Sequence, residues 1–147
     1  MVIRRLLATR AHGAAVLVRL IVGAVFLSEG IQKFLFPGQL GAGRFAKIGL
    51  PAPELLAPLV GCFEITCGLL VLLGLLTRLA VVPLITVMLV AILTTKLPMF
   101  VSSGFWVMAH EARTDWSMLL GSLYLLIVGA GTWSLDAVLA RRNAAKD

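Results

Sequence analysis

Charged residues are scarce in this chain. Asp, Glu, Lys and Arg make up 14% of its 147 residues, against roughly a quarter in soluble domains. Hydrophobic residues make up 60%, and the mean hydropathy is +1.01. This balance excludes an ordinary soluble enzyme and predicts a membrane protein. Because one helical crossing takes about 20 residues, the chain has room for about four or five crossings and for no second, soluble catalytic domain.

Cysteine and histidine are also scarce, with two of each. Cys62 and Cys67 lie on one predicted helix with their Cα atoms about 8 to 9 Å apart, so we expect no disulfide between them. His12 and His110 fall outside the apolar stretches, and the sequence has no CxxC pair, Walker loop, GxGxxG loop or Ser-His-Asp order. We therefore expect no metal and no intrinsic cofactor. The roles of His110 and of both cysteines stay open.

The net charge of +6 comes largely from the two ends of the chain. The basic residues there are Arg4, Arg5, Arg10, Arg141, Arg142 and Lys146. Without a recognition motif this charge does not predict nucleic-acid binding, whereas arginines that flank apolar runs are typical of cytoplasmic membrane flanks beside anionic lipid. The leader and the run after it also resemble a signal peptide, but the run continues to Phe36, which favours a retained helix.

Four apolar runs bounded by turn residues predict an all-α bundle of four transmembrane helices, at residues 16–36, 55–76, 79–99 and 116–135. The runs are continuously apolar, which excludes the alternating pattern of a β-barrel. We expect a basic leader at 1–15, a membrane domain at 16–136 and a basic tail at 137–147. Lys and Arg counts outside the runs predict that this multi-pass protein has both termini in the cytoplasm.

Ionisable residues inside these runs are the strongest indication of function. Glu29, Lys33, Glu64 and Lys96 each cost about 2.5 to 3.5 kcal/mol near the centre of a lone membrane helix, so we expect them to meet one another or water inside the bundle. Glu64 falls near the midplane, and the others fall in the outer half. The sequence thus predicts a polar pocket that opens toward the periplasm. Its expected ligand-binding residues are Glu29, Gln32, Lys33, Glu64, Lys96, Glu111 and Asp115.

A purely structural interpretation stays open for the same residues. Glu29 and Lys33 are spaced to pair along one helix, the lysines Lys33 and Lys96 are long enough to reach the outer headgroups, and Glu64 can be neutral or bonded to one neighbour. Glu64 is the hardest to explain in this way, because a short carboxylate near the midplane cannot reach the surface. Glu64 is therefore the candidate proton carrier.

Short motifs in a fixed order along the chain resemble the DoxX family of small bacterial membrane proteins. They are Arg19, Gly23, Gly30, Lys33, Phe36-Pro37, the loop at 49–53, Glu64, the turn at 73–78, Glu111 and the segment 129–136. The resemblance implies a four-helix inner-membrane protein. Relatives are described as subunits of thiosulfate:quinone oxidoreductase, or as partners in membrane complexes that handle thiols and oxidative stress.

These observations favour an integral subunit of a membrane redox system whose pocket binds a quinone headgroup or a small sulfur oxyanion. Lys33 and Lys96 would hold a carbonyl or an anion, and Glu64 would take or give protons. No intrinsic active site is identified, so enzymatic activity in the chain itself stays open. The alternative is a non-catalytic scaffold or chaperone that recruits soluble partners. A transporter is disfavoured because no inverted repeat is evident. Expected partners are the lipid bilayer and either other subunits or further copies of the chain.

Overall fold

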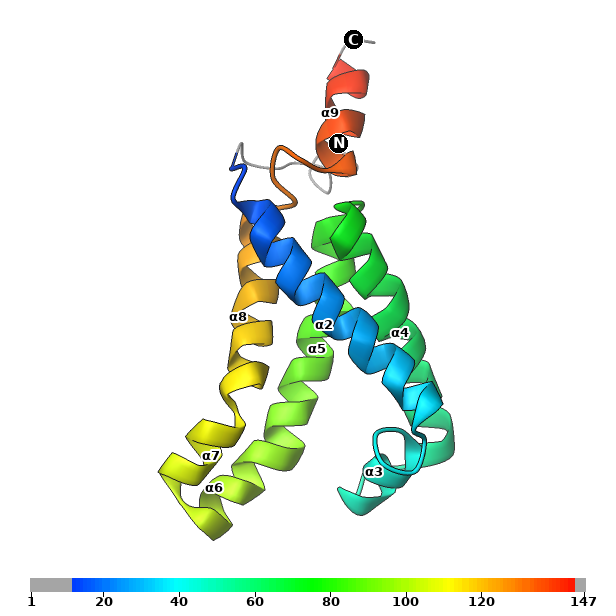
Figure 1. The fold of residues 1–147 in the computed structure, drawn as a ribbon, viewed down its shortest axis with the longest axis vertical. Helices are drawn as coiled ribbons and strands as arrows, with labels where there is room; N and C mark the ends of the chain where they lie inside the picture. The colour runs from blue at the N-terminus through cyan, green and yellow to red at the C-terminus, as the bar shows by residue number, and fades with distance from the viewer. Residues whose placement is uncertain (1–11, 145–147) are drawn as a thin grey trace.

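The computed structural model describes residues 12–144, and every regular element in this part of the chain is helical (Figure 1). The arginines predicted to form the basic leader, and Lys146, lie outside the described residues. The helices are α2 (Ala15–Leu35), α3 (Ala42–Lys47), α4 (Pro53–Leu73), α5 (Thr77–Ala91), the π-helical turn η1 (Ile92–Lys96), α6 (Leu97–Ser103), α7 (Phe105–Glu111), α8 (Arg113–Val128) and α9 (Leu135–Ala144).

Three helices are long and apolar enough to cross a membrane: α2, α4 and the continuous helix Thr77–Ser103 formed by α5, η1 and α6. They confirm three of the four predicted spans. Only 33% of the most apolar window is buried inside the molecule in α2 and α4, and 17% in the third, so lipid must cover the rest of these surfaces. The bundle is therefore a multi-pass membrane structure.

The fourth predicted span is shorter than expected. The sequence predicts apolar helix over 116–135, but α8 ends at Val128 and has 16 residues, fewer than the roughly 20 that one crossing needs. Gly129 and Gly131 follow with φ of 87° and 82°, a backbone conformation that ends a right-handed helix. Ala112 alone separates α8 from α7. A fourth crossing stays a prediction.

Glycines allow α2 and α4 to pack with their backbones close together. A Cβ atom on Gly30 would lie 2.8 Å from the Gly61 carbonyl oxygen, and one on Gly68 would lie 2.8 Å from the Leu27 amide nitrogen. Both obstacles are backbone atoms, which cannot rotate away. Such contacts are typical of helix pairs in membranes, where small residues let dispersion forces act at short range. The crossing of α2 over α4 is visible in Figure 1.

We expect Gly30→Ala to destabilise the bundle by about 2 kcal/mol, because the new methyl group forces α2 away from α4. The measurement is unfolding in mixed micelles with increasing sodium dodecyl sulfate. Gly38→Ala is the matched control, since its Cβ would meet nothing within 4 Å, and it should change stability by less than about 0.5 kcal/mol. Equal effects of the two substitutions would contradict the close-packing interpretation.

A buried polar cluster closes the end of the bundle at which α2 begins and α9 lies (Figure 1). Arg19 of α2 is 3% exposed and donates hydrogen bonds to four backbone carbonyls, those of Val71, Leu72, Ala130 and Trp133. The Asp136 carboxylate, 2% exposed, accepts from the amides of Leu76 at 2.7 Å and Thr77 at 3.0 Å. Unpaired amides and carbonyls at helix ends must find partners, and these two side chains provide them for α4 and α5.

Candidate functional site

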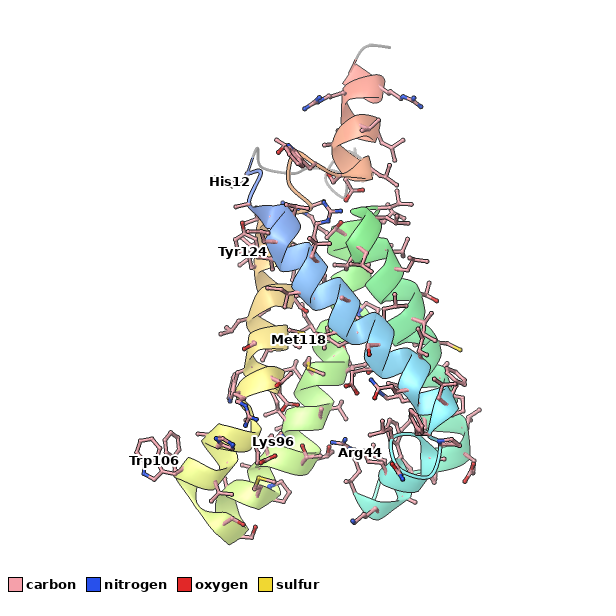
Figure 2. All side chains as sticks on the ribbon, in the orientation of Figure 1. His12, Arg44, Lys96, Trp106, Met118 and Tyr124 are labelled. Atoms are coloured by element: carbon pink, nitrogen blue, oxygen red, sulfur yellow. The ribbon has the colours of Figure 1, made fainter. Side chains whose placement is uncertain are left out.

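A cavity of about 460 Å³ lies toward the opposite end of the bundle, among α2, α3, α4, α5, η1 and α8. Figure 2 labels Arg44 and Lys96 near this end and Met118 deeper among the helices. The apolar walls of the cavity include Phe26, Phe45 and Met118. Its polar lining consists of Glu29, Lys33, Arg44, Glu64, Thr94, Thr95, Lys96, Thr114 and Asp115. Apolar walls with a few convergent polar groups are typical of small-molecule sites.

One ion pair on the cavity wall joins α2 to α4. The Lys33 Nζ lies 2.6 Å from the Glu64 Oε2, and the two side chains are 10% and 3% exposed. The close backbone approach at Gly30 and Gly61, about one helical turn away from each residue, brings these side chains within reach. Lys33 thus pairs across helices. Its contact with Glu29 on its own helix is a 3.5 Å hydrogen bond to the backbone carbonyl.

A second ion pair joins the third predicted span to α8. The Lys96 Nζ lies 3.3 Å from the Asp115 Oδ2, with side-chain exposures of 12% and 19%. Lys96 ends the π-helical turn η1, where the Thr94 and Thr95 hydroxyls donate to carbonyls one turn earlier, those of Val90 and Ala91. Single π turns inside α-helices occur often at functional sites. This turn places three polar residues of one helix at the cavity.

Five of the seven predicted ligand-binding residues line the cavity: Glu29, Lys33, Glu64, Lys96 and Asp115. Gln32 and Glu111 do not. Gln32 lies about 60° around α2 from Glu29, on the side away from Lys33, and donates a hydrogen bond to the Ser28 hydroxyl at 2.9 Å. Glu111 is exposed at the end of α7, and the break at Ala112 separates it from α8, the helix that carries Asp115.

The predicted ligand-binding set did not include Arg19, Arg44 or the two cysteines. Arg19 is a further charged residue inside the first span, and its position in an apolar run was a visible sign of burial, but its partners are backbone atoms of distant segments. Arg44 reaches the cavity only through the fold of the loop before α4. Cys62 is exposed and Cys67 is buried, both as free thiols. Among residues 12–144, no three His, Cys, Asp or Glu side chains gather as metal ligands.

The fold and the site together define a multi-pass helical membrane protein whose charged side chains pair around a cavity. The sequence model of the DoxX family matches residues 14–97, and the chain belongs to this family. It is 54% identical to "Uncharacterized membrane protein Rv3486" of Mycobacterium tuberculosis, over 96% of this chain and 90% of the relative. It is 33% identical to "Putative oxidoreductase CatD" of Bacillus subtilis, over 82% of each. No solved structure matches the chain significantly.

Proposed function

We propose that the protein is an integral subunit of a redox system in the bacterial inner membrane, and that its cavity binds a quinone headgroup or a small sulfur oxyanion. The observation that carries this proposal is the Lys33–Glu64 pair, a buried cation and carboxylate on the wall of a cavity of about 460 Å³. An ionisable residue inside a membrane bundle is a candidate functional residue, because burying it there is costly. The printed name of CatD supports oxidoreductase chemistry.

In this proposal the residues of the chain bind and deliver protons. Lys33 and Lys96 orient a carbonyl or anionic oxygen, and Glu64, held by Lys33, passes protons to it. Reduction of a quinone to a quinol takes up two electrons and two protons. A partner subunit that oxidises a thiol or a sulfur oxyanion supplies the electrons, and the cavity supplies a proton route.

The proposed topology has four crossings and both chain ends in the cytoplasm, with α7 and α8 together forming the fourth crossing. Two features support it. The start of α2 and the whole of α9 lie at one end of the bundle, and Arg78, Arg141 and Arg142 belong to segments at that end. The cavity lies toward the other end and would therefore open to the periplasm.

The test is ligand-induced thermal stabilisation of the purified protein in nanodiscs. A ligand that binds only the folded protein at about 100 times its Kd stabilises it by about 2.7 kcal/mol. We expect menadione or thiosulfate to do this for the wild-type protein. We expect neither to do it for the double variant Lys33→Met/Glu64→Met, which keeps the volume of the wall and removes both charges. Glu54→Gln, at an exposed carboxylate that does not line the cavity, should respond like wild type.

If the wild-type protein gains no stability from either ligand, the binding proposal is wrong. Gentle extraction followed by mass spectrometry then tests the remaining alternative, a scaffold or chaperone. A scaffold or chaperone would release its soluble partners when the two charges are removed, although no ligand stabilised it.

A further inference from the structure

The cavity has one cationic side chain that no carboxylate neutralises. Of the three cations in its lining, Lys33 pairs with Glu64 and Lys96 pairs with Asp115. Arg44 of α3 makes no ion pair within residues 12–144, and its side chain is exposed. Glu29 is the carboxylate in the lining that likewise has no ion pair among these residues. Arg44 is therefore available to an incoming anion, and Glu29 is its one competitor on the walls.

The segment that carries Arg44 folds back on itself and lies against the end of α2. The Gly43 amide donates to the Pro37 carbonyl at 3.0 Å, and the Phe45 amide donates to the Gly41 carbonyl at 3.1 Å. A Cβ atom on Gly41 would lie 2.6 Å from the Lys33 carbonyl oxygen, so only glycine fits there. Phe45, 8% exposed, adds its ring to the cavity wall. The backbone of Arg44 is thus held at a fixed place beside the cavity.

We propose that Arg44 is a specificity-determining residue that recruits ligands bearing an anionic oxygen group to the cavity. A guanidinium group presents a planar fork of donors that binds two oxygens of a carboxylate, sulfonate or phosphate at once. Lys33 and Lys96 each have a carboxylate partner that balances their charge, so Arg44 adds the unbalanced positive charge that favours an anionic ligand over an uncharged one of the same shape. This inference rests on the proposed function, because it assumes that the cavity takes a small ligand.

The anionic oxygen could belong to a ligand in the cavity or to a lipid headgroup beside it. We assign it to the ligand, because Arg44 lines the same cavity as the two ion pairs. Two probes of similar shape separate charge from shape: naphthoquinone sulfonate, which is anionic, and menadione, which is uncharged. Nanodiscs of phosphatidylcholine alone contain no anionic lipid, and nanodiscs with added phosphatidylglycerol restore it.

In phosphatidylcholine nanodiscs, we expect Arg44→Gln to weaken the binding of naphthoquinone sulfonate about tenfold and to change menadione binding less than about twofold. Lys47→Gln is the matched control, since Lys47 is an exposed cation on the same helix that does not line the cavity, and both affinities should stay within about twofold. Glu29→Gln should leave the affinity for naphthoquinone sulfonate unchanged or raise it, because it removes the competing carboxylate.

Three results would overturn the role of Arg44 while leaving the proposed function in place: menadione binds and the sulfonate does not, Arg44→Gln leaves sulfonate binding unchanged, or Glu29→Gln weakens it as much as Arg44→Gln does. A difference between wild type and Arg44→Gln that appears only with phosphatidylglycerol would assign Arg44 to lipid and would also overturn it. If neither probe binds the wild-type protein, the inference is wrong, and if thiosulfate does not bind it either, the proposed function is wrong as well.

Discussion

Arg19→Gln is expected to destabilise the folded bundle by about 3 to 5 kcal/mol. Four carbonyl oxygens from two separate segments converge on this one guanidinium group: Val71 and Leu72 at the end of α4, and Ala130 and Trp133 in the turn before α9. A hydrogen bond to a charged donor contributes about 1.5 to 3 kcal/mol, and a buried acceptor left without a partner adds its desolvation cost. Glutamine offers two donors on a shorter chain, so it leaves at least two carbonyls unsatisfied.

The measurement is the free energy of unfolding in mixed micelles, read from the loss of helical circular dichroism. Arg78→Gln is the matched control, because Arg78 lies at the same end of the bundle and donates one exposed hydrogen bond to the Ile127 carbonyl at 2.8 Å. It should lose no more than about 1.5 kcal/mol. Arg19→Lys should fall between the two, since an ammonium group keeps the charge but cannot reach four acceptors arranged for a planar fork. A loss below about 1 kcal/mol for Arg19→Gln would contradict the stabilising role of these four hydrogen bonds.

Hydropathy predicted the membrane helices well because their length follows directly from the thickness of the hydrocarbon layer. The spans expected at 16–36 and 55–76 are the helices Ala15–Leu35 and Pro53–Leu73. The end of α8 was predicted seven residues too late, because apolar residues continue past Val128 while the backbone turns at Gly129. Hydropathy does not register a positive φ, so a turn inside an apolar run is invisible to it.

The site was predictable as a set of charges and not as a set of pairs. The cost of isolated charge in lipid predicts that Glu29, Lys33, Glu64 and Lys96 meet one another or water. The structure gives Lys33, Glu64 and Lys96 an ion-pair partner each, and Glu29 is exposed and lines the cavity without an ion pair among the described residues. The choice of partner depends on where helices approach and break. Lys33 meets Glu64 because α2 and α4 pack through glycines, and Lys96 meets Asp115 because η1 rewinds the end of its helix. Neither the crossing nor the π turn is encoded in the periodicity of apolar residues.

Lys33→Met is expected to lower the free energy of unfolding by about 3 to 5 kcal/mol, which is more than we expect for Glu64→Met. It leaves the Glu64 carboxylate, whose side chain is 3% exposed near the middle of α4, without the cation 2.6 Å away. Removing one partner of a buried ion pair is costly because the other charge stays desolvated and unpaired. A glutamate side chain is too short to reach the headgroups from that depth.

Glu64→Met should lower the free energy of unfolding by only about 1 to 2 kcal/mol, because the Lys33 side chain, once unpaired, can reach the surface of the membrane. Lys33 lies two residues before the end of α2, and its long side chain can extend toward the lipid headgroups once Glu64 no longer holds it. Lys47→Met serves as the control for losing a lysine, since Lys47 is exposed on α3 and pairs with no carboxylate among the described residues, and its loss should be below about 0.5 kcal/mol.

The double variant Lys33→Met/Glu64→Met should be within about 1 kcal/mol of the wild-type protein, because apolar side chains of similar volume replace both charges and no desolvated group is left. The sum of the single losses would then exceed the loss in the double variant by about 3 kcal/mol or more, which is a strong coupling between the two sites.

Equal losses for the two single variants would contradict the expectation that unpaired Lys33 reaches the surface of the membrane. Additive losses in the double variant would mean that the two side chains are stabilised separately. A double variant that folds stably and no longer responds to quinone would assign the pair to ligand binding, since a merely structural pair could be replaced in this way with no loss of function.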